Sequence, residues 1–311
     1  MMAQPSTDSS GLPRVLVIFP GALGDLICFV PALRALERRH RGAVIELMAR
    51  EELGRFSTGR IGVARAHSID RREVALLFAE SGADARGFFG AFQRIYSFFA
   101  SGNRSFREAL AIASDAELSF HPFRPDRAGH VAAAYLHALG EPVDSLECRV
   151  QVLPQDLAAA ARRLSDHGLT AGRFALLLPG SGSAQKNWPA VKFAELARRL
   201  KPRVAAAIAL GPAEAGLASS FAETGCAILT GMDLGELAGI AAGASLFVGN
   251  DSGVSHLAAA AGAPGIALFG PTDPARWRPL SQSVRVLRCT PLADLDTDQV
   301  VASALQVLGS P

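Results

Sequence analysis

The sequence of 311 residues is poor in cysteine, in net charge and in long apolar runs, and each shortage excludes a class of protein. Its four cysteines are scattered without a Cys-x-x-Cys pair, which argues against a zinc ribbon or a disulfide scaffold and indicates a reducing cytoplasm. A net charge of +2 does not favour a nucleic-acid ligand. No run of about 18 residues is free of Gly, Pro or polar breaks, so we expect no membrane span. The polar start, Met1–Gly11, lacks the apolar core of a signal peptide.

What the chain does contain is typical of a folded protein with two domains. Hydrophobic residues make up 49% and charged residues 19%, which is enough to form a core and argues against disorder. Only three of the 31 basic residues are lysines: Lys186, Lys192 and Lys201. Genomic base composition explains that bias, but it does not explain why Lys186 lies within a Gly/Ser-rich loop.

Each half of the chain contains a series of alternating strand, loop and helix patterns. The first half opens with a strand over 14–19, a turn, a helix over 26–39 and a strand over 44–48. The alternation in both halves predicts an α/β fold of two Rossmann-like doubly wound domains that face a central cleft. The further elements that we expect are strands over 118–120, 174–178, 204–210, 245–248 and 266–269, and helices over 74–78, 86–99, 126–139, 189–200, 234–242 and 254–261.

Four segments follow from these patterns. We expect a disordered tail over residues 1–12, an N-terminal acceptor-binding domain over 13–165 and a nucleotide-sugar-binding domain over 166–289. Residues 290–311 are predicted to form a C-terminal helix, and whether it crosses back to the first domain stays open.

The first candidate site is the turn Gly21-Ala-Leu23-Gly24-Asp25. Glycines allow a tight turn and a close approach of ligand to backbone, so we place Leu23 and Gly24 at the acceptor side of the cleft. Asp25 has two interpretations: a cap at the start of a helix, or a general base that faces the cleft. The turn lacks the full Gly-x-Gly-x-x-Gly fingerprint, and no Gly-Lys-Ser/Thr of a Walker A loop is present.

Two further loops are predicted to bind phosphate. The loop from Pro179 to Pro189 has small residues that leave backbone N–H groups open to phosphate oxygens, with Ser181, Ser183 and Lys186 as further donors. The second, Gly249–His256, lies between a strand and a helix rich in small residues, where exposed N–H groups and the helix dipole attract an anion. Its candidate donor-binding residues are Asp251, Ser252, Gly253 and His256, although for His256 a hydrogen bond to nearby backbone is the simpler role.

Two weaker candidates follow other strands. Glu214, in Leu210-Gly-Pro-Ala-Glu214, is suited to binding a ribose diol, but a carboxylate at an exposed helix start is an equal alternative. The turn Phe269-Gly-Pro-Thr-Asp273-Pro is either a further part of the ligand site or a turn that its prolines fix.

Together these motifs resemble glycosyltransferase family 9, which contains the ADP-heptose:lipopolysaccharide heptosyltransferases. The resemblance rests on Leu23-Gly-Asp25 with Pro31, the 179–189 loop with Lys186, Gly249–His256 and Phe269–Asp273, in that order. It implies a GT-B fold and inverting transfer of a heptose from ADP-heptose to a lipopolysaccharide-core or related lipid-linked acceptor. It also implies Asp25 as the base, Lys186 and Asp251 at the donor, and Glu214 at the ribose or base.

The chemistry of the residues agrees with this resemblance. An acceptor hydroxyl attacks the anomeric carbon, Asp25 takes its proton, and Lys186 with the loops and the helix start stabilises the departing diphosphate. These groups replace a metal, so we expect neither a metal nor a cofactor; Asp294 and Asp296 have the spacing of a metal pair but are interpreted as helix caps. We expect a monomer without nucleic-acid partners in the cytoplasm, with peripheral contact at the inner membrane surface left open.

Several alternatives stay open. The chain could transfer another nucleotide-activated sugar, hydrolyse or epimerise a nucleotide sugar, sense such a sugar without catalysis, or be a Rossmann oxidoreductase, which the missing fingerprint disfavours. The aromatic stretch 87–99 is interpreted as buried core, with a lip that meets a lipid acceptor as the alternative. Arginines that either bind an anionic lipid surface or form a solvated helix face are Arg34, Arg38, Arg39 and Arg41.

Overall fold

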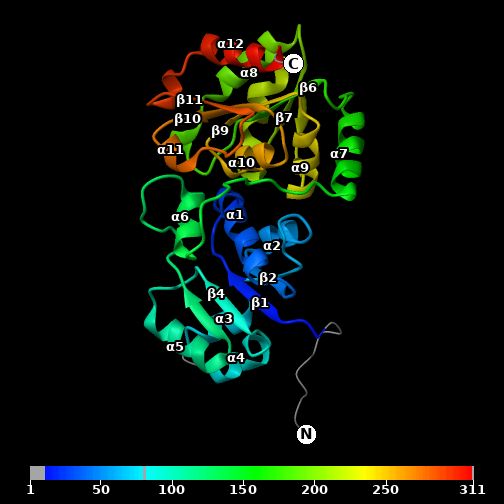
Figure 1. The fold of residues 1–311 in the computed structure, drawn as a ribbon. Coiled ribbons are helices and arrows are strands. Elements are labelled where there is room, and N and C mark those ends of the chain that lie inside the picture. The colour runs from blue at the N-terminus through cyan, green and yellow to red at the C-terminus, as the bar shows by residue number, and fades with distance from the viewer. Residues whose placement is uncertain (1–10, 80–81, 310–311) are drawn as a thin grey trace. The chain divides into compact units, whose positions relative to one another are not determined.

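A computed structural model describes residues 11–79 and 82–309, which form two compact α/β units (Figure 1). Of the described residues, the first unit holds those up to Ala22 and those within Phe29–Leu146, and the second holds Leu23–Cys28 and those from Glu147 onward. Apart from Gly11 and Leu12, the predicted tail lies outside the described residues.

The sheet of the first unit has five parallel strands in the order β3-β2-β1-β4-β5. Its central strands are apolar because both faces are covered by helices. The strands are β1 (Arg14–Ile18), β2 (Val44–Ala49), β3 (Arg65–Ser68), β4 (Arg94–Ser97) and β5 (Glu117–Phe120), and the helices are α1 (Leu23–Arg39), α2 (Glu51–Ser57), α3 (Arg72–Leu76), α4 (Gly82–Phe89), α5 (Arg104–Ala113) and α6 (Val131–Ala138).

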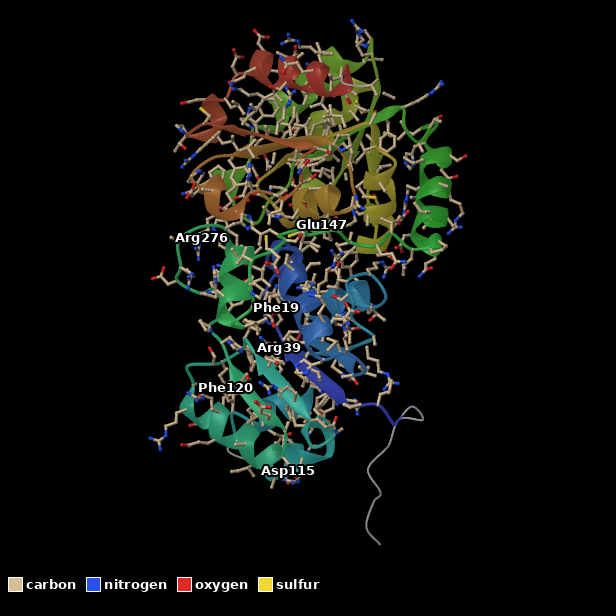
Figure 2. The ribbon with its side chains drawn as sticks, in the orientation of Figure 1. Phe19, Arg39, Asp115, Phe120, Glu147 and Arg276 are labelled. Carbon is tan, nitrogen blue, oxygen red and sulfur yellow. The ribbon has the colours of Figure 1, made fainter. Side chains whose placement is uncertain are left out.

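Alternate side chains of β1 point to opposite faces of this sheet and join two cores. Leu16 and Ile18 pack in a buried cluster with residues of α3, α4 and α5. On the other face, Phe19 and Phe98 pack against Phe29 of α1 and Tyr135 of α6 (Figure 2 labels Phe19).

The second unit has six parallel strands in the order β11-β10-β9-β6-β7-β8. The chain runs from β6 outward to β8 and then returns to β9 on the other side of β6. The strands are β6 (Phe174–Leu178), β7 (Ala205–Ala209), β8 (Ala227–Leu229), β9 (Leu246–Asn250), β10 (Gly265–Phe269) and β11 (Val284–Arg288).

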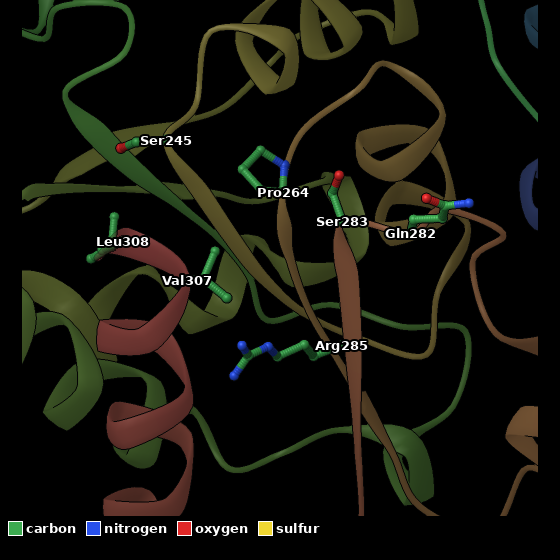
Figure 3. Close-up of a pocket in the computed structure, with 7 residues that line it drawn as sticks. All are labelled: Ser245, Pro264, Gln282, Ser283, Arg285, Val307 and Leu308. Carbon is green, nitrogen blue, oxygen red and sulfur yellow. The ribbon is translucent and has the colours of Figure 1, made fainter. Parts of the chain in front are cut away.

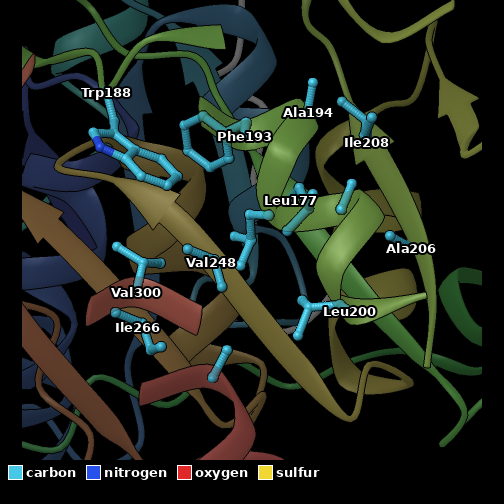
Figure 4. Packing of buried hydrophobic residues seen from close by; sticks show 14 of the residues in the cluster. Leu177, Trp188, Phe193, Ala194, Leu200, Ala206, Ile208, Val248, Ile266 and Val300 are labelled. Carbon is cyan, nitrogen blue, oxygen red and sulfur yellow. The ribbon is translucent and has the colours of Figure 1, made fainter. Parts of the chain in front are cut away.

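Helices cover both faces of this second sheet (Figure 1). One face packs against α8 and α12 through a buried cluster that includes Trp188, Phe193 and Val300 (Figure 4). On the other side, α10 packs on β9 and on α9, and α7 packs on α9. The remaining elements are α7 (Pro154–Asp166), η1 (Ala184–Lys186), α8 (Ala190–Leu200), η2 (Pro212–Thr224), α9 (Leu234–Ala242), α10 (Gly253–Ala260), α11 (Pro274–Trp277), η3 (Leu292–Asp294) and α12 (Thr297–Leu308).

The structure differs from the sequence expectations at several elements. The helix expected over 86–99 is wrong: α4 ends at Phe89, where Gly90 leaves no room for a side chain against the Arg86 carbonyl oxygen, and β4 follows. Residues 147–165 pack with the second unit, whereas the prediction assigned them to the first domain. The C-terminal helix, α12, packs on α8, β9 and β10 of the second unit.

Two smaller expectations agree with the structure. The stretch 87–99 is largely buried core, since Phe89, Phe92, Tyr96 and Phe98 are each at most 3% exposed. Asp296 caps α12 by accepting a hydrogen bond from the Asp298 backbone N–H. The same interpretation is wrong for Asp294, which is the last residue of η3 and not an N-cap. Among the described residues, no helix is long and apolar enough to cross a bilayer.

Candidate donor-binding site

The candidate loops gather at the carboxyl edge of the second sheet. In an open parallel sheet, ligands bind where the strand order reverses, outside the carboxyl ends of the two strands that flank that point. Here the reversal lies between β6 and β9. The loop that begins at Pro179 follows β6, and Asp251 and Ser252 follow β9. The two predicted phosphate loops therefore flank the switch point.

Lys186 and Asp251 meet across the switch point. The Lys186 ammonium lies 2.8 Å from Asp251 Oδ2, and the side chains of the pair are 34% and 7% exposed. The ion pair offsets the cost of burying the carboxylate, and the partly exposed lysine stays accessible to an anion. The structure thus brings together two of the predicted donor residues.

The two serines of the first loop shape its turn. Ser181 Oγ donates to the Ser183 carbonyl oxygen at 2.8 Å and accepts from the Ser183 N–H at 3.2 Å. The single turn η1 follows, with the Lys186 N–H donating to the Ser183 carbonyl oxygen. These local bonds fix the course of the backbone before the lysine, in the way that serine side chains form turns.

The start of α10 carries the second loop. Ser252 is its N-cap, with Oγ accepting from the Ser255 N–H at 3.4 Å, and Ser255 Oγ donates to the Asn250 carbonyl oxygen at 2.6 Å. Ser252 therefore occupies the N-cap of this helix, and Asp251 pairs with Lys186. The positive end of the helix dipole lies next to that pair.

Glu214 lies against the first phosphate loop. Its Oε2 accepts from the Gly211 N–H at 3.1 Å, which is the helix-start role that the sequence left open. A Cβ added at Gly180 would lie only 2.5 Å from Glu214 Cδ, so this carboxylate packs directly over the glycine. The ribose role stays a prediction, but the carboxylate stands beside the loop that would hold the diphosphate.

The first turn of α1 belongs to the second unit and packs on the start of α10. A Cβ added at Gly253 would lie 2.9 Å from the Gly24 nitrogen and from Leu23 Cβ, so Gly253 permits the close approach of the two helix starts. Asp25 lies in this turn, 6% exposed. It is the third residue of the helix and not its N-cap, so the capping interpretation of Asp25 is wrong in that form.

Cys28 and His256 join the same two helices. Cys28 Sγ lies 3.7 Å from His256 Nδ1, and both side chains are buried. Burial raises the pKa of the Cys28 thiol well above its usual value, and the charges of Cys148, Asp25 and Asp251 raise it further. The thiol is therefore held in its protonated form beside the imidazole. Asp25 lies in the first turn of α1 and Asp251 directly before the N-cap of α10, and these two helix starts pack together.

The turn after β10 adjoins the first phosphate loop, because a Cβ added at Gly270 would lie 3.3 Å from the Gln185 carbonyl oxygen. Asp273 caps α11 by accepting from the Ala275 N–H, and a contribution of this turn to ligand binding stays a prediction. No cluster of His, Cys, Asp and Glu that could hold a metal occurs among residues 11–79 and 82–309. A hollow of about 450 Å³ lies at the amino ends of β9, β10 and β11, opposite the switch point, so it is not the predicted site (Figure 3).

Sequence reasoning missed two residues that organise the site. Asn250 ends β9 and contacts the 179–188 loop, and Cys28 supports the turn that carries Asp25. The sequence did contain a signal for Asn250. A polar amide at the end of an apolar strand is buried with that strand and needs hydrogen-bond partners nearby. Nothing local to Cys28 indicates its partner, which lies 228 residues away.

A doubly wound α/β unit with a Lys–Asp pair at its switch point belongs to the Rossmann-like class, whose members bind ligands at that point of the sheet. Residues 124–300, more than half of the chain, match the family model described as glycosyltransferase family 9 (heptosyltransferase). The chain belongs to this family and is a glycosyltransferase of the heptosyltransferase type, as the motifs predicted.

Individual relatives agree with this assignment. The chain is 26% identical over 284 residues to lipopolysaccharide heptosyltransferase 1 of Escherichia coli O18:K1:H7, covering 84% of this chain and 87% of the relative. It is 38% identical over 112 residues to lipopolysaccharide heptosyltransferase 2 of E. coli K12, about a third of either chain: 33% and 32%.

Solved structures confirm the fold. A family 9 glycosyltransferase from Veillonella parvula matches with a TM-score of 0.80 at 22% identity, over 95% of this chain and 97% of that one. E. coli ADP-heptose lipopolysaccharide heptosyltransferase II matches with a TM-score of 0.75 at 21% identity, over 95% and 98%. The predicted GT-B architecture of two Rossmann-like units is confirmed.

Proposed function

We propose that this chain transfers a heptose from ADP-heptose to a lipid-linked sugar of the lipopolysaccharide core, with inversion at the anomeric carbon. The observation that carries the proposal is the Lys186–Asp251 pair at the switch point of the second sheet, beside the helix start of α10. The family supports the type of reaction, and its relatives, which include lipopolysaccharide heptosyltransferases and an ADP-heptose-dependent one, support the donor and acceptor classes.

In this proposal the second unit binds the donor. The diphosphate lies between the 179–188 loop and the start of α10, where Lys186 exchanges part of its interaction with Asp251 for a phosphate oxygen. Ser181, Ser183, Ser252 and Gly253 shape the backbone around it, and His256 supports the helix from behind. Glu214, next to Gly180, is positioned to accept hydrogen bonds from the ribose hydroxyls.

The transfer step needs a base and a stabilised leaving group. The acceptor hydroxyl oxygen bonds to the anomeric carbon while the bond from that carbon to the phosphate oxygen breaks. Asp25 takes the hydroxyl proton, and ADP leaves with its new negative charge facing Lys186 and the positive end of α10. Fixed groups of this kind, aimed at developing charge, lower the barrier by about 3–4 kcal/mol each.

Three further features belong to the proposal. The lysine and the helix dipole serve in place of a metal ion, so the reaction needs no cofactor and persists in excess chelator. The protein acts as a monomer at the cytoplasmic face of the inner membrane. It contacts that surface peripherally, because its acceptor is anchored there by lipid.

The experiment is a transfer assay with a matched variant. The chain is incubated with ADP-heptose, with and without a heptose-free core acceptor, and in parallel with UDP- and GDP-sugars. We expect glycosylated acceptor with ADP-heptose alone, and little donor loss without acceptor. Rapid donor loss without acceptor would instead indicate a hydrolase or epimerase, and use of another nucleotide would reassign the donor.

Asp25→Asn tests the base in the same assay. Removal of a general base lowers kcat by about 10²–10⁴-fold, while the shape of the side chain is kept. We expect that loss with ADP affinity, measured by calorimetric titration, within a factor of about three of the unchanged chain, because in this proposal the carboxylate acts on the acceptor hydroxyl and not on the diphosphate. Turnover near that of the unchanged chain would remove Asp25 from the mechanism.

A further inference from the structure

The loop that carries Lys186 has little regular structure of its own. Between Pro179 and Trp188 it forms one short 3₁₀ turn, and residues 182–185 are exposed. A loop that must present a lysine to a phosphate loses conformational entropy when it is ordered, unless the fold orders it in advance. The ends of the loop are therefore where its position is determined.

One side chain holds both ends of this loop. Asn250, at the end of β9, is fully buried. Its Nδ2 donates to the Pro179 carbonyl oxygen at 2.7 Å, and its Oδ1 accepts from the Trp188 backbone N–H at 3.0 Å. Pro179 is the first residue after β6, and Trp188 is the last before Pro189 and α8. The amide thus closes the loop into a ring.

The two partners determine the orientation of the amide. Trp188 N–H can only donate and the Pro179 carbonyl can only accept, so a flipped amide would lose both bonds. Neither a carboxylate nor a hydroxyl of similar size can supply one donor and one acceptor at these two points at once. The next residue, Asp251, binds the Lys186 ammonium. Two consecutive residues therefore fix the loop: Asn250 binds its two ends, and Asp251 binds its lysine.

A second set of contacts fixes Trp188 itself. Its indole Nε1–H donates to the Leu295 carbonyl oxygen at 3.0 Å, and its ring packs at 5.0 Å from that of Phe193 (Figure 4). The Lys192 ammonium donates to the same Leu295 oxygen at 2.8 Å. The Trp188 end of the closed loop is therefore anchored to the core. The segment that carries Lys186 extends from this anchored end.

We propose that Asn250 is a positioning residue for the diphosphate-binding loop: its amide joins Pro179 to Trp188 and so holds Lys186 where the leaving group develops charge. The role rests on the proposed function, since it concerns the same donor site. It acts through the backbone of the loop and requires no contact between Asn250 and the substrate.

Amide hydrogen exchange on the full chain tests the ring without any substrate. Asn250→Ala removes both bonds, Asn250→Asp keeps the acceptor for Trp188 N–H and faces the Pro179 oxygen with a second oxygen, and Asn187→Ala is the matched control. Asn187 touches the same amide only at 3.4 Å. We expect faster exchange at Trp188 in Asn250→Ala alone. Unchanged exchange at Trp188 in that variant would overturn the proposed ring.

Donor kinetics test the consequence for the reaction. We expect kcat/KM for ADP-heptose to fall about 100-fold in Asn250→Ala, the size of effect that misplacing a catalytic group by an ångström produces. Asn250→Asp should lose a similar factor, and Asn187→Ala less than threefold. Thermal unfolding of each variant sets an assay temperature at which all are folded. A kcat/KM within threefold of the unchanged chain in both Asn250 variants would overturn the proposal.

A double-mutant cycle separates positioning from simple stabilisation. If Asn250 acts through Lys186, then in a Lys186→Ala background Asn250→Ala should cost less than about fivefold, because the group that it positions is gone. A full 100-fold loss in that background would assign Asn250 a structural role only. If the chain without substitutions does not consume ADP-heptose, the proposed donor is wrong. The loop closure by Asn250 is tested independently by the hydrogen-exchange measurement.

Discussion

The two sheets of this molecule have the same kind of switch point but fill it with opposite chemistry. In the first unit the strand order reverses between β1 and β4, and the residues that follow those strands are aromatic: Phe19 stacks on Phe29 at 4.4 Å and meets Phe98 at 6.1 Å. In the second unit the corresponding residues are Pro179, Gly180, Asp251 and Ser252, with Lys186. One reversal is a packed core, and the other is a polar site.

The difference shows that topology alone does not make a ligand site. A doubly wound sheet offers a crevice at the carboxyl ends of its strands, but aromatic side chains in that crevice turn it into hydrophobic core. Small and polar residues leave backbone N–H groups and a lysine accessible there. We therefore expect substitutions at the first switch point to change stability and those at the second to change donor chemistry.

The largest effect on stability should come from Phe19→Ala. Phe19 is fully buried and contacts several rings, so its removal leaves a cavity that costs about 3–5 kcal/mol of unfolding free energy. Urea unfolding of the full chain measures it, with Ser183→Ala in the exposed loop as control, expected within about 0.5 kcal/mol of the unchanged chain. A loss below about 1 kcal/mol at Phe19 would contradict the packed-crevice interpretation.

Lys186→Ala should have the largest effect of a single donor-loop change on catalysis. Loss of a charged group aimed at the leaving diphosphate costs about 10²–10³-fold in kcat. Lys201→Ala, which removes an exposed lysine after α8, is the control of the same residue type. Transfer from ADP-heptose at saturating acceptor measures both. Equal kcat values in the two variants would show that Lys186 does not stabilise the leaving group.

A buried charge cluster in the first unit contrasts with the Lys186–Asp251 pair. Glu46 of β2 is completely buried and accepts hydrogen bonds from Arg14 of β1 and His67 of β3, each at 2.6 Å. The Glu46 cluster lies between neighbouring strands, whereas the Lys186 side chain is one-third exposed and accessible to a ligand. Burial raises the pKa of Glu46, but the hydrogen bonds from His67 and Arg14 outweigh it and lower the pKa from 4.5 to about 2.

This contrast predicts the pH at which the first unit weakens. Because the folded pKa of Glu46 is depressed, its contribution to stability is present above about pH 4.5 and is lost as the pH falls towards 2. The shift corresponds to about 3 kcal/mol. Chemical unfolding at a series of pH values measures it, and Glu46→Gln should flatten the acid limb of the profile. A variant with the same acid limb as the unchanged chain would show that other carboxylates cause the loss.

The sequence predicted the second unit better than the first for physical reasons. Long apolar strands such as Phe174–Leu178 are recognisable because both of their faces are covered. The polar edge strand Arg65–Ser68 and the three-residue strand Ala227–Leu229 carry no such run, and they were missed. Motif order also placed Lys186 and Asp251 in one site, because loops after adjacent parallel strands meet at the same edge.

Contacts between distant segments could not be derived in that way. The packing of Gly24 against Gly253 and of Cys28 against His256 depends on how the first turn of α1 meets α10, which no local pattern encodes. The Asn250 ring is intermediate: the residue lies inside a recognised motif, but its two partners bracket a loop that begins 71 residues earlier. Residue types indicated the chemistry, and tertiary packing determined which atoms perform it.

Gly180→Ala should have the smallest effect and gives the finest test of the polar switch point. The added Cβ would lie 2.5–2.7 Å from the Glu214 side chain, whereas at Gly182, two residues further on, nothing lies within 4 Å. If Glu214 binds the ribose, its displacement should weaken ADP about tenfold, or about 1.4 kcal/mol, in calorimetric titration. Gly182→Ala should leave ADP affinity unchanged. Only Gly180→Ala is expected to move the Glu214 carboxylate. Equal ADP affinity in the two variants would therefore show that Glu214 does not bind the ribose and only accepts the hydrogen bond from the Gly211 N–H.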